Sequence, residues 1–138
     1  EKVIEYGLAE IPSTSRLYAG VKHILSLFCS GASREETVAD IHSRWNDELP
    51  YHWCHVIPNA EIVTAALLYG KRDLAQTVCT AVQCGFDTAG SVAGMICGAG
   101  RIPPEWKEPV GGVLTTDIFG IGSITVQEIV RRAESLIP

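Results

Sequence analysis

Apolar residues recur at spacings of three and four along most of this chain, which is the pattern of one face of an α-helix. The clearest example precedes Cys29, where the apolar positions are Leu17, Val21, Ile24, Leu25 and Phe28. Only residues 113–119 have a modest strand character. The pattern predicts an all-α domain of five to seven helices around one core.

Capping signals mark where several of these helices begin. Ser33 followed by Glu36 is the pattern of a capping box, and Thr125 followed by Glu128 repeats it. Asp73 has Gln three residues later and predicts another start. A short first helix is expected over residues 2–8. Further helices are expected to begin at Ser13, Thr14 or Ser15, and with Pro58 in the first position. Helix ends are expected at Gly31, at residues 47–50 and at Gly70.

Small residues fill a later segment, residues 89–100, which we expect to form a helix of its own. Gly90, Gly94 and Gly98 recur at every fourth position, so they share one stripe of that helix. Glycine costs about 1 kcal/mol against Ala inside a helix, so the stripe needs a packing reason. We expect a neighbouring helix to approach closely there. Residues 85–88 are then the junction before this helix.

Composition and charge exclude several classes of protein. The chain has 138 residues, 46% hydrophobic and 20% charged, with a net charge of −5. An acidic chain lacks the basic excess that a nucleic-acid-binding surface needs. No apolar run approaches the roughly 20 residues of a membrane span, and no signal peptide is visible. We therefore expect neither a nucleic-acid nor a membrane partner.

The five cysteines form no Cys-x-x-Cys pair, and their number is odd. Four of them lie in apolar segments. This usage favours buried free thiols in a reducing compartment over disulfides. We therefore expect a cytoplasmic protein.

Residues 51–55 hold the most reactive local group of side chains, in the order Tyr-His-Trp-Cys-His. Structural zinc sites use two separated pairs of ligands, and His23 and His42 lie on other predicted helices. Zinc binding and a Cys54 nucleophile beside His55 are therefore weaker interpretations than a loop packed under the next helix.

Asp87 and Thr88 offer a carboxylate and a hydroxyl at the predicted helix junction. Such oxygen ligands suit a hard cation such as Mg²⁺. An N-cap explains the same residues more simply and is favoured on these residues alone. The pair Ser33 and Glu36 and the acidic residues 47–48 are interpreted as helix punctuation and solvated surface.

The order of several segments resembles the C-terminal part of the ADP-ribosylglycohydrolase family, in a bacterial branch. The matching segments are residues 11–16, 45–60, 65–70, 73–88, the small-residue helix and the Ile-Pro-Pro-Glu-Trp run at 102–106. The resemblance covers most of the chain. It implies a multi-helix orthogonal bundle in which residues 1–138 form one domain, like the C-terminal half of a longer hydrolase.

The resemblance also implies a chemistry. Members of the family bind two Mg²⁺, sometimes Mn²⁺, and cleave the bond between an ADP-ribosyl or related ribosyl group and a side chain or small molecule. Asp87 matches the first carboxylate of the Asp-Thr-Asp metal motif, as a metal ligand and catalytic residue. Thr88 matches its middle residue and takes part in cofactor binding.

The sequence departs from the family at the next position. Ala89 stands where the family has its second Asp, and compared with the family the chain skips about half a dozen residues there. Either the metal-binding loop is shorter in this protein, or the protein has further loop residues between Thr88 and Ala89 that the sequence leaves out.

The family's N-terminal metal motifs are also missing, and the chain begins at Glu1 rather than Met. We expect the chain alone to be inactive and to need an N-terminal half, in the same polypeptide or as a partner. Contact with a second copy is a further expectation. The alternatives are a non-catalytic helical subunit descended from such enzymes and a chance resemblance.

Overall fold

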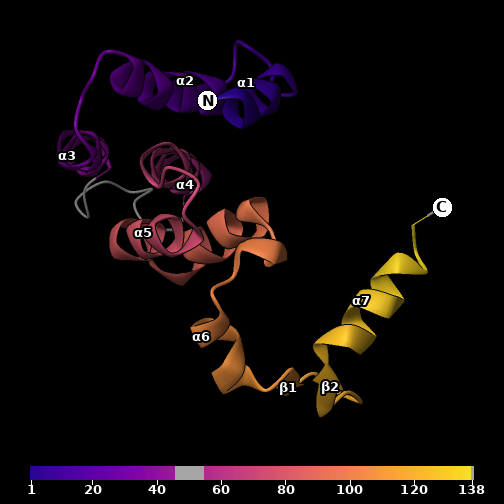
Figure 1. The fold of residues 1–138 in the computed structure, drawn as a ribbon. Helices are drawn as coiled ribbons and strands as arrows, with labels where there is room; N and C mark the ends of the chain where they lie inside the picture. Colours follow the sequence, from indigo (N-terminus) through magenta and orange to yellow (C-terminus); the bar gives the residue numbers. More distant parts are fainter. Residues whose placement is uncertain (46–54, 138) are drawn as a thin grey trace. The chain divides into compact units, whose positions relative to one another are not determined.

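The computed structural model describes residues 1–45 and 55–137, and its contacts separate the chain into two compact units (Figure 1). The first unit is Glu1–Arg101 and the second is Ile102–Pro138. The described residues form helices and one two-stranded hairpin, which confirms the all-α class. That residues 1–138 form a single domain stays a prediction.

In the part of the first unit that the structure describes, there are five α-helices followed by one turn of 3₁₀-helix. They are α1 (Lys2–Ala9), α2 (Arg16–Cys29), α3 (Arg34–Arg44), α4 (Val56–Tyr69), α5 (Leu74–Cys97) and the 3₁₀ turn Ala99–Arg101.

Helix α4 is the centre of this unit and lies between α2 and α5 (Figure 1). Most of its residues are buried, including Ile62, Ala65 and Ala66. A helix that is apolar all round must be covered on several sides. Helices α2 and α5 supply much of that cover, and Ile24 of α2 and Ala81 of α5 are fully buried.

Side-chain caps begin these helices much as the sequence predicts. The Ser33 hydroxyl accepts from the Glu36 backbone N–H at 3.2 Å, and the Ser33 N–H donates to Glu36 Oε2 at 2.8 Å. This confirms the capping box, and the bond from the Ser33 backbone lowers the pKa of Glu36. Ser15 caps α2, and Asp73 caps α5 through the Gln76 N–H.

Two of the predicted starts need correction. Helix α4 begins at Val56 with His55 as its N-cap, so Pro58 is in the third position rather than the first. Proline is tolerated there because the first four N–H groups of a helix have no partner within it. Thr125 caps its helix as predicted, but the Glu128 carboxylate binds Arg131 and Arg132.

The prediction that the cysteines are buried is also partly wrong. The four described cysteines carry free thiols, as expected, but Cys29 and Cys79 are exposed. Both lie on outward positions of amphipathic helices whose other faces form the core. Cys84 is half-buried, and burial raises the pKa of its thiol. Cys54 and the helix end expected at residues 47–50 lie outside the described residues.

The second unit contains short elements, α6 (Pro104–Lys107), a 3₁₀ turn (Glu108–Val110), β1 (Val113–Thr115), β2 (Ser123–Thr125) and α7 (Val126–Glu134). Strands β1 and β2 pair antiparallel, with Leu114 opposite Ile124, so strand structure is confirmed at the start of residues 113–119. None of its described residues is buried, and the apolar face of α7 is exposed at Val126, Ile129 and Val130. Within the described ranges, no helix is long and apolar enough to cross a membrane.

Candidate functional site

Asp87 and Thr88 lie in the middle of α5, and both are exposed. Residues 85–88 belong to α5 and do not begin a helix of their own, so the N-cap interpretation is wrong. The Asp87 Oδ1 accepts from the Thr88 N–H at 2.9 Å.

Helix α5 nevertheless does not run straight. Gly94 and Val78 are sixteen positions apart, which corresponds to about 24 Å along a straight helix. A Cβ at Gly94 would lie 3.5 Å from Val78 Cγ2, and a Cβ at Gly90 would overlap Val82 Cγ2. The two pairs are symmetric about position 86. The helix therefore folds back on itself there, and Asp87 and Thr88 lie at the fold-back.

This fold-back gives the glycine stripe its packing reason. Gly90 faces Val82 without room for a side chain, so the predicted close approach is confirmed, although both partners belong to α5. Gly94 faces Val78 at a distance that would leave room for a Cβ. Gly98 does not share the role, because it ends the helix with a φ of 86°, which is a conformation suited to glycine.

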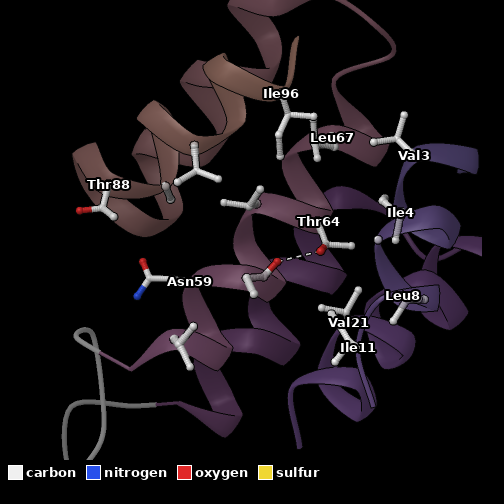
Figure 2. Close-up of a pocket in the computed structure, with 16 residues that line it drawn as sticks. Val3, Ile4, Leu8, Ile11, Val21, Asn59, Thr64, Leu67, Thr88 and Ile96 are labelled. Atoms are coloured by element: carbon white, nitrogen blue, oxygen red, sulfur yellow. Dashed lines mark hydrogen bonds between the residues drawn. The ribbon is translucent and has the colours of Figure 1, made fainter. Parts of the chain in front are cut away.

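The fold-back also borders a mainly apolar cavity of about 510 Å³ (Figure 2). Helices α1, α2, α4 and α5 all contribute to its wall. Thr88 and Asn59 lie at one end, and the apolar side chains of Ile4, Leu8 and Val21 lie at the other (Figure 2). Thr88 is the predicted site residue that lines this cavity.

Oxygen ligands at the fold-back are few. Asp87 supplies a carboxylate and Thr88 a hydroxyl, and within residues 1–45 and 55–137 no three His, Cys, Asp or Glu side chains come close enough to hold a metal ion. The described part of the chain therefore does not provide ligands for two Mg²⁺. His52 and Cys54, from the predicted zinc and nucleophile candidates, lie outside the described residues.

Two of the described histidines, His23 and His55, have contacts with residues other than Asp87. His23 Nε2 is 3.0 Å from Asp40 Oδ2. The His55 ring stacks on the Trp45 indole at a centroid distance of 5.6 Å, and its Nδ1 accepts from the Ile57 N–H. The stacking of His55 on Trp45 supports the packing interpretation for His55, and the zinc interpretation stays a prediction.

A buried polar cluster on another face of α4 was missed by sequence reasoning. The Glu61 side chain is completely buried and accepts two hydrogen bonds from Arg44 and one from the Trp45 indole N–H. Arg44 also donates to Asp40 from Nε and Nη2. The available signal was Glu61 itself, a single acidic residue in an apolar run.

The charges in this cluster stabilise one another. Burial alone would raise the pKa of Asp40, but hydrogen bonds from Arg44 and His23 outweigh it and lower that pKa. Burial would likewise lower the pKa of Arg44, but its bonds to Glu61 and Asp40 raise it. The cluster joins α2, α3 and α4, and Gly20 leaves the space in which Glu61 lies. Its groups bind one another, so the cluster is structural.

Comparison with known proteins adds one match. The model of the ADP-ribosylglycohydrolase family matches residues 1–135, nearly the whole chain. No curated protein and no solved structure matches the chain.

Proposed function

Because the chain belongs to the ADP-ribosylglycohydrolase family, we propose that it forms part of a hydrolase that cleaves the bond between an ADP-ribosyl or related ribosyl group and its attachment. The observation that carries this proposal is the family match over residues 1–135. The order of motifs from His55 to Trp106 supports it.

We propose Asp87 as a ligand of Mg²⁺ or Mn²⁺ and Thr88 as its companion in the same site. The family is generally metal-dependent. Asp87 is an exposed carboxylate at the fold-back of α5, and the Thr88 hydroxyl has no hydrogen-bond partner among the described residues. Both are hard oxygen ligands of the kind that Mg²⁺ prefers.

The two oxygen-bearing residues at the fold-back do not make a two-metal site. Each Mg²⁺ needs near-octahedral oxygen coordination, and most proteins supply it with several carboxylates and water. We propose that the remaining ligands come from a segment with the family's N-terminal motifs, in the same polypeptide or in a partner. The chain alone is then inactive.

Binding of ADP-ribose tests this proposal. The chain is titrated with ADP-ribose in Mg²⁺, in Mn²⁺ and in chelator, alone and together with an N-terminal portion of an ADP-ribosylglycohydrolase. We expect metal-dependent binding only in the combination. Asp87→Asn abolishes it, because the amide is a much weaker metal ligand than the carboxylate. Asp117→Asn, at an exposed carboxylate in the other unit, leaves it unchanged.

A non-catalytic helical subunit derived from the family is the second candidate. The observation that favours it is the single carboxylate at the fold-back, with Ala89 in the next position. This candidate expects association with the N-terminal portion but no metal-dependent binding of ADP-ribose. That result would refute the hydrolase proposal.

A further inference from the structure

We propose that the cavity between α1, α2, α4 and α5 binds a small, uncharged, mainly apolar molecule whose single polar group, a hydroxyl or a carbonyl, lies at the end formed by Asn59 and Thr88. This proposal does not depend on the activity proposed above.

The size of the cavity is the first reason. Here about 510 Å³ is left open among four helices. That volume lies within the roughly 300–1,000 Å³ of small-molecule sites.

The charge of its wall selects the class of ligand. No lining residue is ionisable, and apolar side chains such as Val63, Leu67 and Val92 provide most of the surface. A charged ligand would lose its hydration there without gaining a partner. The pyrophosphate of ADP-ribose is therefore a poor occupant, and an uncharged molecule is a good one.

The polar groups of the wall select its orientation. The Thr64 hydroxyl donates to the Ala60 carbonyl at 2.7 Å, so it is turned to its own helix (Figure 2). The Asn59 amide is oriented by its bond from Nδ2 to the His55 carbonyl at 2.9 Å. The Thr88 hydroxyl can donate or accept. The ligand's polar group therefore belongs beside Asn59 and Thr88, and its apolar body extends toward α1 and α2.

The cavity is open to solvent, so a ligand can enter it. Val3 and Val56 line it and are 62% and 63% exposed, and Ile96 is 47% exposed. Gly7 of α1 also lines it, and a Cβ at this position would meet no atom within 4 Å. Open space at Gly7 allows a side chain to be added into the cavity without a clash at the Cβ.

Three matched probes test the proposal on the full chain by ligand-observed NMR and calorimetry. They are 4-propylphenol, propylbenzene and 4-propylbenzoate. We expect the two uncharged probes to bind with a Kd of roughly 1 mM or tighter, and the phenol to bind about 2–10 times more tightly than propylbenzene. The carboxylate should bind at least about 10 times more weakly than the phenol, because its charge is desolvated.

Variants locate the binding. Gly7→Leu fills the cavity and should weaken both uncharged probes at least about 10-fold, because their space is taken. Gly7→Ala is the control, with the same helical position and little added volume. Thr88→Val should remove the preference for the phenol and leave propylbenzene unchanged. This second variant decides the question even if Gly7→Leu does not fold.

Several outcomes would overturn the proposal. They are equal binding of the carboxylate and the phenol, probe binding that folded Gly7→Leu leaves unchanged, and a phenol preference that survives Thr88→Val. Absence of probe binding would also overturn it. If Gly7→Leu in that case dissociates an oligomer measured by light scattering, the cavity is covered by a second copy of the chain.

Discussion

Arg44 of α3 and Glu61 of α4 form a bidentate ion pair in the interior of the first unit. Arg44 Nη1 lies 3.0 Å from Glu61 Oε1, and Arg44 Nη2 lies 2.7 Å from Glu61 Oε2. The Glu61 side chain is 0% exposed. A buried carboxylate of this kind is stable only when its partners satisfy it, and Trp45 Nε1 supplies the third hydrogen bond at 3.1 Å.

Glu61→Ala should lower the free energy of unfolding by about 3–5 kcal/mol, because it leaves part of the Arg44 charge and the Trp45 N–H without their partner. Urea denaturation followed by circular dichroism measures this. Glu61→Gln should cost less, since its amide oxygen still accepts. The double change Arg44→Met with Glu61→Leu is the control and should cost less than Glu61→Ala, because neither charge of the pair stays buried alone, although Trp45 and Asp40 each lose a partner. A loss below about 1 kcal/mol for Glu61→Ala would contradict the burial of the pair.

Gly20→Ala should destabilise the protein by about 1–3 kcal/mol. A Cβ at this position would lie 2.5 Å from Glu61 Oε1 and 3.0 Å from Ile57 Cγ2, and Glu61 is held by Arg44 and cannot move away. Thermal unfolding of the variant measures the effect.

Gly7→Ala is the matched control for Gly20→Ala. It makes the same chemical change within a helix but meets no atom within 4 Å, so it should stabilise the protein by up to about 1 kcal/mol through helix propensity. Equal melting temperatures for the two variants would show that α2 does not approach Glu61 as closely as the structure has it.

The free energy of unfolding should depend on pH through Asp40, which lies in α3. Its pKa in the folded protein is lowered below the ordinary value of 3.8, despite burial, by bonds from Arg44 and His23. A carboxylate with a lowered folded pKa contributes stability above its unfolded pKa and loses it as the pH falls through the folded value. Wild type should exceed Asp40→Asn by about 1 kcal/mol near pH 7, and the difference should vanish below the folded pKa.

Urea titrations of both proteins at steps from neutral pH into the acid range measure this difference. Asp117→Asn serves as the control, because it removes an exposed carboxylate that has no such partners among the described residues. A gap between wild type and Asp40→Asn that stays constant with pH would contradict the assigned hydrogen bonds.

Local signals in the sequence predicted much of this fold because each acts over one turn of helix. The capping oxygens of Ser33, Asp73 and Thr125 begin helices where expected, since each satisfies a backbone N–H three positions away. The family resemblance likewise rests on contiguous motifs, and the family match confirms it.

These local signals could not predict contacts between residues that are far apart in the chain. Arg44 and Glu61 are seventeen positions apart, and only the packing of α3 on α4 brings them together. The exposure of Cys29 and Cys79 likewise depends on which faces of α2 and α5 are covered. Asp87 and Thr88 were expected at a junction between two helices and lie instead within α5, beside its fold-back. Their ligand roles stay predictions.

The fold-back of α5 yields the last prediction. Gly90→Ala should lower the free energy of unfolding by about 1–3 kcal/mol, because the new methyl overlaps Val82 Cγ2 on the facing part of the helix. Gly94→Ala is the matched control: its Cβ would lie 3.5 Å from Val78 Cγ2, an ordinary contact, so the gain in helix propensity should make it neutral or stabilising.

Val82→Ala should rescue Gly90→Ala, because removing the Val82 methyls clears the space that the new Cβ needs. A double-mutant cycle measured by urea denaturation should give a favourable coupling of about 0.5–3 kcal/mol between the two positions. In a straight helix, positions 82 and 90 would be about 12 Å apart and would not couple. Additive effects would therefore show that α5 is straight and that Asp87 and Thr88 do not lie at a chain reversal.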